Sequence, residues 1–144
     1  MSGKTRAAMR LALIGVLSVL IGLGLYVRYA PTDIARWHRM PAVIENRDFD
    51  NGVMRVVPGK AEDLEQLHII IVHTPRTRVL AVSPDGHMRT YVTRSRVLRF
   101  PDYITVRYRD GHIEIWSRAR FGRSDLGVNA ERVERWLRAL AERR

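Results

Sequence analysis

The longest feature of the hydropathy pattern is an apolar run near the start of the chain. Residues 11–27, LALIGVLSVLIGLGLYV, contain no charged side chain. A membrane-spanning helix needs about 17–25 mainly apolar residues. The pattern therefore predicts a transmembrane anchor over residues 11–28, after a basic head over residues 1–10. Aromatic residues follow where membrane interfaces favour them, at Tyr26, Tyr29 and Trp37.

Two other interpretations of this run stay open. A cleaved signal peptide needs small residues before the cut, in an A-x-A-like pattern, and Arg28, Ala30 and Pro31 suit cleavage poorly. A buried core helix is the second alternative. We expect an uncleaved signal anchor.

Beyond the anchor, the continuous run gives way to alternating and helical spacings. Residues 29–51 hold two prolines and scattered charge, and we interpret them as a connector, with a short interfacial helix at Asp33–Arg39 as one option. Residues 52–144 predict a soluble α+β domain, in the order strand, helix, four strands, helix, with an antiparallel sheet and both helices packed on one face. The expected strands are 52–57, 77–82, 88–93, 104–109 and 112–120.

Turn and capping residues support these elements. Asp110-Gly111 is a strong signal for a hairpin turn between two alternating strands. Pro75 ends the first helix of the domain, because the residue before proline avoids the α region. Asn129 is the expected N-cap of the last helix. That helix has an apolar stripe, with Arg132 expected away from its centre; the stripe consists of Val133, Trp136, Leu137 and Leu140.

Charge changes this picture by adding a strongly basic region. The formal net charge is +10, and only Lys4 and Lys60 are lysines, so 23 of the 25 basic residues are arginines. Residues 76–123 contain eleven arginines and four acids. A surface of this kind attracts anionic lipid, acidic partners or nucleic acid.

The basic residues around the anchor bear on its orientation. Lys4, Arg6 and Arg10 precede the run, and a similar number of arginines follows it. A short basic head before an N-terminal span more often stays in the cytoplasm. We therefore expect a single-pass protein of the bacterial inner membrane with its C-terminal domain in the periplasm, where nucleic acid is an unlikely partner.

The loop before the last helix combines glycines, an acid and arginines. Gly122 and Gly127 permit unusual backbone angles, and Ser124 and Asp125 can satisfy local amides. One hypothesis is a structural clamp, with Asp125 paired to an arginine. Another is an anion or partner site, and a third is simple surface charge. The candidate arginines for the first two are Arg94, Arg96, Arg118, Arg120 and Arg123.

Catalytic and metal motifs are weak in this chain. The absence of cysteine removes thiol chemistry and cysteine metal sites, and the five histidines show no H-E-x-x-H spacing. Asp102 and Asp125 are the remaining candidates for a carboxylate pair. We expect no catalytic residue, no metal and no cofactor.

Several separated motifs resemble one bacterial family. Ala119 to Asn129, ARFGRSDLGVN, is similar to an S-R-x-G-x-S-D-x-G-x-N-like run, and Arg94-Ser95-Arg96 with Phe100-Pro101-Asp102 is similar to S-R and F-x-D patterns upstream. On these motifs, residues 31–140 resemble the domain of unknown function 1499. The resemblance implies membrane association and no agreed reaction.

Three hypotheses for function follow. The first is a non-catalytic domain that binds an anionic ligand or lipid headgroup through its arginine-rich sheet and loop. The second is an accessory subunit of a membrane protein complex. The third is a hydrolase that uses Asp125 or Asp102.

Overall fold

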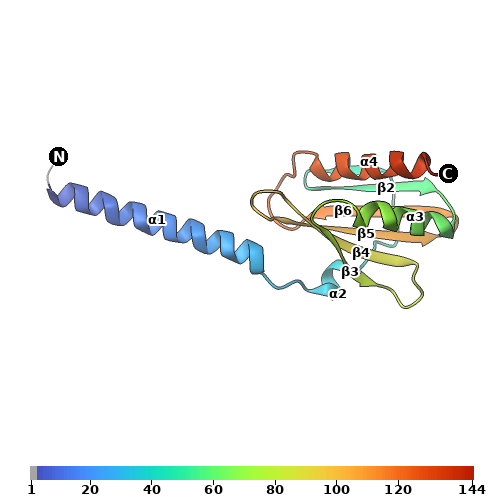
Figure 1. Ribbon diagram of the computed structural model, residues 1–144, viewed down its shortest axis with the longest axis horizontal. Helices are drawn as coiled ribbons and strands as arrows, with labels where there is room; N and C mark the ends of the chain where they lie inside the picture. Colours follow the sequence, from blue (N-terminus) through green and yellow to red (C-terminus); the bar gives the residue numbers. More distant parts are fainter. Residues whose placement is uncertain (1–2) are drawn as a thin grey trace. The chain divides into compact units, whose positions relative to one another are not determined.

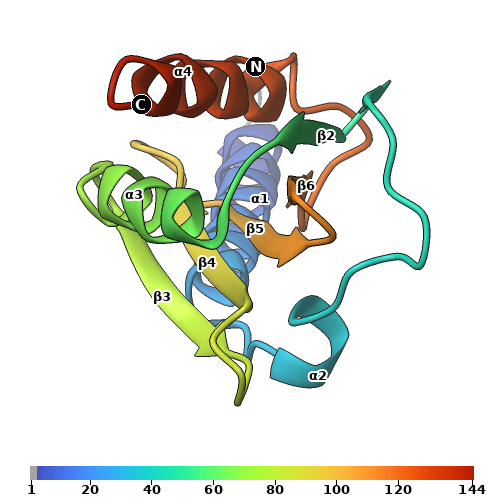
Figure 2. The ribbon, with the colours of Figure 1, turned by 90° about the vertical axis from the view of Figure 1, so that its right-hand side faces the viewer.

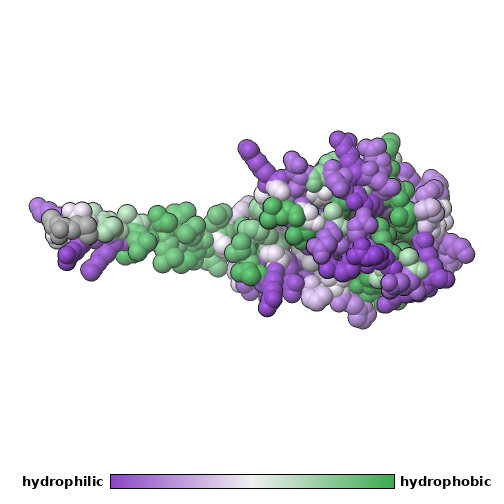
Figure 3. Space-filling view, turned by 90° about the horizontal axis from the view of Figure 1, so that it is seen from above, coloured by the Kyte–Doolittle hydropathy of each residue, from purple (hydrophilic) through white to green (hydrophobic). Residues whose placement is uncertain are grey.

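The structure is a computed structural model that describes residues 3–144, and the chain divides into two compact units, the first ending at Thr32 and the second spanning Asp33–Arg144. The first unit is one helix, α1 (Gly3–Tyr29), of 27 residues. At ~1.5 Å per residue it is about 40 Å long. With a mean hydropathy of 2.2 it is long and apolar enough to cross a membrane. Figure 3 shows hydrophilic side chains at its start and hydrophobic ones along its middle.

The second unit is built on a six-stranded antiparallel sheet (Figures 1 and 2). The strand order is β1-β2-β6-β5-β4-β3. The strands are β1 (Arg47–Phe49), β2 (Gly52–Pro58), β3 (Thr77–Val82), β4 (Met88–Arg94), β5 (Pro101–Arg109) and β6 (His112–Ala119). Two helices, α3 (Ala61–Val72) and α4 (Val128–Ala141), lie on one face. The predicted α+β class, with an antiparallel sheet and two packed helices, is confirmed.

The core lies between the two helices and the sheet. Because successive side chains of a strand point to opposite faces, every second residue of the central strands meets the helices. Ile104 and Val106 of β5 lie beside Ile113 and Ile115 of β6, and all four side chains are fully buried. The helices contribute Leu64, Leu67, Ile71, Val133, Trp136 and Leu140. Burying such a side chain contributes about 1.5–3 kcal/mol, so this layer holds the unit together.

The other face of the sheet is covered by the strap, residues 33–46, which begins with the short helix α2 (Ile34–Trp37). The Trp37 ring stacks on Tyr103 with ring centroids 4.1 Å apart. The Trp37 carbonyl accepts hydrogen bonds from Thr105 and Arg118. Farther along, the carbonyls of Pro41 and Ala42 accept from Arg107 and Arg109.

These contacts differ from the connector expected over residues 29–51. The strap belongs to the second unit, and β1, which follows it, is an edge strand paired with β2. No periodic pattern marks this segment, since it is held largely through its backbone carbonyls rather than through a stripe of apolar side chains.

The two ends of the sheet are built differently. One end, called the turn end, carries the turns at 83–86 and 110–111. Asp110 has φ 50° and Gly111 has φ 77°, which is the backbone of the type I′ turn that hairpins prefer. The other end, called the loop end, carries loop 95–100 between β4 and β5 and loop 120–127 between β6 and α4. Figure 1 shows these two loops at the same end of the sheet.

Candidate functional site

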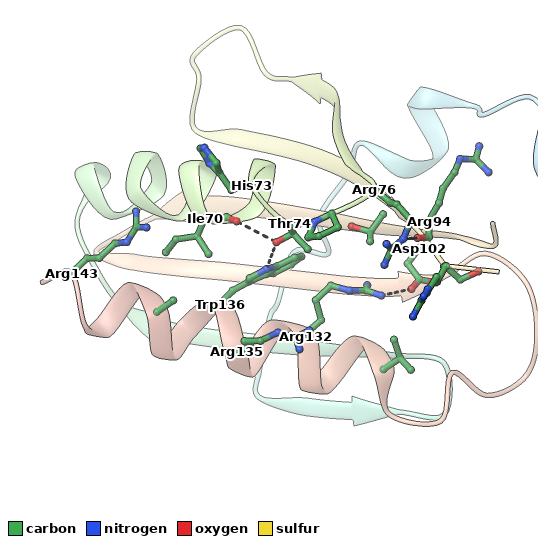
Figure 4. A pocket seen from close by; sticks show the side chains of 16 residues that line it. Ile70, His73, Thr74, Arg76, Arg94, Asp102, Arg132, Arg135, Trp136 and Arg143 are labelled. Carbon is green, nitrogen blue, oxygen red and sulfur yellow. Dashed lines mark hydrogen bonds and ion pairs between the residues drawn. The ribbon is translucent and has the colours of Figure 1, made fainter. Parts of the chain in front are cut away.

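An arginine-rich groove runs between α3 and α4 and reaches the loop end of the sheet (Figure 4). It has a volume of about 740 Å³. Its lining includes six arginines and one carboxylate, Asp102. We call it the arginine groove; its arginines are Arg76, Arg94, Arg96, Arg132, Arg135 and Arg143. This excess of positive charge in a concave surface suits an anion.

A buried ion pair forms one wall of the groove. Nη2 of Arg132 lies 2.9 Å from Oδ2 of Asp102, and the two side chains are 8% and 13% exposed. Figure 4 shows Arg132 extending from α4 toward Asp102 at the start of β5. Burial raises the pKa of the Asp102 carboxyl, and the Arg132 guanidinium partly opposes that rise. Arg132 therefore lies in the buried part of the helix, contrary to the expectation from the apolar stripe.

Asn129 connects this ion pair to the sheet. Its side-chain oxygen accepts from Arg132 at 3.1 Å and from Ser117 of β6. Its side-chain nitrogen donates to Asp125 at 2.7 Å. Asn129 and Ser117 are fully buried, and buried polar groups need such partners to avoid a desolvation cost. The start of α4 is thus fixed to β5 and β6 by a polar network.

The predicted roles of Asn129 and Asp125 need correction. Asn129 is not the N-cap, because α4 is capped at Gly127, with φ 77°, and Asn129 lies inside the helix. The Asp125 carboxylate accepts from the amides of Gly127 and Asn129, so it satisfies the free amides at the helix start. Across residues 3–144 Asp125 forms no ion pair with an arginine. A clamp exists, but its arginine is Arg132 and its acid is Asp102.

The rest of the loop is short-range structure. Ser124 accepts a hydrogen bond from the Leu126 amide at 3.1 Å. Gly122 has φ 91°, a left-handed conformation that glycine adopts easily. The structural role expected for Ser124, Gly122 and Gly127 stays a prediction.

The five arginines predicted as a site do not lie together. Arg94 and Arg96 line the arginine groove. Arg94 also donates to the Arg99 carbonyl at 2.9 Å, which ties it to loop 95–100. Arg123 is exposed in loop 120–127.

Arg118 and Arg120 instead line a second cavity, of about 380 Å³, on the strap side of the sheet. The Arg118 guanidinium lies 3.5 Å from the centre of the Trp116 ring, and its Nη1 has no hydrogen-bond partner. Burial, and secondarily the charge of Arg39, lowers the pKa of Arg118 to about 10. Arg118 holds Trp37 of the strap against the sheet.

Sequence reasoning missed four arginines of the groove, namely Arg76, Arg132, Arg135 and Arg143. The groove-lining residues Arg132, Trp136 and Ala139 of α4, and Arg143 just after its end, follow one another at spacings of three or four residues. Residues at these spacings share one face of a helix. This spacing was the available signal. No sequence signal marks Arg76, since only the pairing of β3 with β4 brings it beside Arg94.

The groove offers mainly cationic binding groups. Within residues 3–144, no three His, Cys, Asp or Glu side chains gather as a metal site would require. Asp102 is bound by Arg132 and Asp125 by backbone amides. The hydrolase hypothesis stays a prediction. Arginine binds phosphate and carboxylate through paired N–H groups, which is the chemistry that this lining can supply.

Comparison with known proteins gives one match. Residues 36–140 match the family model described as a protein of unknown function (DUF1499). No curated protein and no solved structure matches the chain.

Proposed function

Since the chain belongs to the DUF1499 family, whose function is unknown, we propose a function from the arginine groove. The protein is a membrane-anchored, non-catalytic domain that binds an anionic group of the phosphate type. Two sources share this chemistry, a lipid headgroup and a free phosphate. The observation that carries the proposal is the set of six arginines around one groove whose single carboxylate already pairs with Arg132.

The geometry of the groove supports a bound anion in two ways. Arg96, Arg135 and Arg143 are exposed, so their guanidinium groups can turn toward a ligand without breaking the core. The network around Asn129 holds the groove wall in place before a ligand arrives, which reduces the entropy lost on binding.

The location of the domain is part of the same proposal. The helix α1 anchors the chain in the bacterial inner membrane as a signal anchor. The basic head stays in the cytoplasm, and the folded unit lies in the periplasm. This placement would give the groove access to headgroups of the outer leaflet and to small periplasmic anions.

A binding assay on the full-length protein tests the proposal. The protein is reconstituted in phosphatidylcholine nanodiscs and titrated with inorganic phosphate or with dihexanoyl phosphatidic acid, with calorimetric detection. A charge-assisted hydrogen bond contributes about 1.5–3 kcal/mol, so Arg96→Gln, Arg135→Gln and Arg143→Gln should each weaken binding about tenfold or more. Added salt should weaken it as well.

The matched control is Arg78→Gln. Arg78 is an exposed arginine of β3 outside the groove, so its loss should leave affinity almost unchanged. Binding of phosphatidic acid alone would identify a headgroup site, and equal binding of inorganic phosphate would identify a free-anion site. If neither probe binds, or if Arg78→Gln weakens binding as much as the groove variants do, the proposal is wrong.

A further inference from the structure

The two loops at the loop end are joined at their roots. The Arg120 amide donates to the Pro101 carbonyl at 3.1 Å, which joins the root of loop 120–127 to the end of loop 95–100. The rings of Phe100 and Phe121 lie 6.3 Å apart across the two loops. The roots of the two loops are therefore in contact at the same end of the sheet (Figure 1).

The tips of these loops expose large apolar side chains. Leu126 is 91% exposed, Val97 is 82% exposed and Leu98 is 61% exposed. Single exposed apolar residues are ordinary on protein surfaces. Three of them on two loops at one end of a sheet are less ordinary, and exposed apolar surface of this kind can mark a site of interaction with proteins or membranes.

Backbone strain accompanies this exposure. Leu126 has φ 53° and Arg99 has φ 60°. The left-handed region is costly for a side chain that carries a Cβ atom, and asparagine or glycine would fit it better. Leu126 is therefore unfavourable in two ways, through its left-handed backbone and through its exposed apolar side chain. A contact that buries Leu126 would compensate for both.

The charges around the tips favour a particular partner. Loops 95–100 and 120–127 contain four arginines, Arg96, Arg99, Arg120 and Arg123, and the single acid Asp125. The Asp125 carboxylate is already used by the helix start. Apolar tips bordered by basic side chains are the pattern of surfaces that enter the interface of an anionic bilayer.

The connection between α1 and the folded unit is short. Only residues 30–32 separate the end of α1 at Tyr29 from the folded unit, which starts at Asp33. Four extended residue steps span at most about 14 Å. Within the folded unit, Trp37 packs on Tyr103 near the start of β5, beside the root of loop 95–100. From Trp37 the strap runs toward the turn end, because its next carbonyl contacts are with Arg107 and Arg109.

We propose that the loop tips are a membrane-docking surface. Val97, Leu98 and Leu126 enter the interface of an anionic bilayer, and Arg96, Arg99 and Arg123 contact its headgroups. This inference rests on the membrane anchoring in the proposed function, and it does not require the arginine groove to bind an anion.

The absence of native cysteine makes a direct test possible. The full-length variants Leu126→Cys and Asp110→Cys are each labelled with the environment-sensitive dye NBD and reconstituted in nanodiscs of phosphatidylcholine and phosphatidylglycerol. Asp110 is exposed at the turn end and serves as the control. We expect the dye at position 126 to show blue-shifted emission, several-fold weaker quenching by aqueous iodide and stronger quenching by doxyl-labelled lipid.

A second variant separates docking from folding. With the dye on Val97→Cys, the substitutions Leu98→Asn and Leu126→Asn remove apolar tips, and asparagine tolerates the left-handed backbone at position 126. The protein should stay folded while the dye at position 97 loses most of its protection from iodide.

Each other outcome overturns a defined part of the inference. Failure of the protein to enter nanodiscs would overturn the anchoring and the docking together. Entry with equal iodide quenching at positions 126 and 110 would overturn the docking alone. Protection in native membranes but not in nanodiscs of pure lipid would replace the lipid partner with a protein.

Discussion

The turn end and the loop end of the sheet differ in how they use left-handed backbone. At the turn end, the residues with positive φ are Gly86, Asp110 and Gly111, which are residue types that adopt this conformation readily. At the loop end, Arg76, Arg99 and Leu126 adopt it as well, although their side chains disfavour it. The left-handed backbone therefore falls on residue types that accept it at the turn end, and at the loop end three of these positions are occupied by residue types that disfavour it.

We propose that this difference marks the loop end as the part of the fold that makes contact with a partner. The loop end holds the opening of the arginine groove, the strained residues and the exposed apolar tips. Departures from local preference concentrate at functional sites in proteins, since elsewhere they bring no gain. We therefore expect substitutions at the two ends to have opposite effects.

The largest effect is expected from removing the internal support of the loop end. Arg132→Met leaves the buried Asp102 carboxylate without its partner, and breaking such a pair costs about 3–5 kcal/mol. Urea unfolding of the full-length protein in detergent, followed by tryptophan fluorescence, measures the loss. Arg135→Met is the control, because its ion pair with Glu131 is exposed, and it should change stability by less than about 0.5 kcal/mol. Equal losses in both variants would contradict the prediction.

Introducing a strained residue at the turn end should have the next largest effect. Asp110→Leu places at φ 50° the residue type that the loop end tolerates. The free energy of unfolding should fall by about 1–2 kcal/mol. Asp110→Asn provides the comparison, since asparagine accepts this backbone, and it should remain close to the wild type in the same urea measurement.

The reverse exchange at the loop end should stabilise the fold. Leu126→Asn relieves the left-handed leucine and removes an exposed apolar side chain, so the free energy of unfolding should rise by up to about 1 kcal/mol. The midpoint of urea unfolding reports this change. A loss of stability would show that Leu126 makes a contact on which the folded unit depends.

The smallest effect is expected in how the free energy of unfolding changes with pH, which should differ between an acid of the loop end and an acid of the turn end. Burial raises the pKa of Asp102 above 3.8. Protonation of Asp102 therefore favours the folded state, and this contribution to stability is complete below pH 3.8 and is lost as the pH rises through the raised pKa. A hydrogen bond from Ser83 lowers the pKa of Asp85 at the turn end, so its contribution is present above pH 3.8 and is lost as pH falls. Unfolding of Asp102→Asn and Asp85→Asn from pH 3 to 7 should therefore differ from the wild type with opposite slopes.

Much of the architecture could be predicted from local pattern. Alternation along the strands, helical spacing along α3 and α4, and the Asp110-Gly111 turn each carry their own signal. The strap could not be found this way. Its carbonyls accept hydrogen bonds from Arg107, Arg109 and Arg118. Because every residue has a backbone carbonyl, such contacts do not require a particular residue type and produce no sequence pattern.

The candidate site was only half predictable, for a different reason. Strand alternation places Ser117 on the helix face of β6 and Arg118 on the strap face. Arg118 and Arg120 therefore line a cavity on the strap side, whereas Arg94 and Arg96 line the arginine groove and Arg123 lies in a loop outside both. Arg132 was assigned away from the apolar stripe because arginine is seldom buried. Its burial depends on Asp102, thirty residues earlier in the chain, and such a long-range pair is invisible to local spacing.

The Trp37 contacts have a mechanical consequence for a protein anchored through α1. Trp37 lies only four residues after the start of the folded unit, and it joins β5 and β6, the two central strands. Tension on the chain reaches these contacts before it reaches β1 at the edge of the sheet. A pull on the chain from its N-terminal side is therefore first borne by the centre of the sheet, whose strands are paired on both sides, before it reaches the edge strand β1.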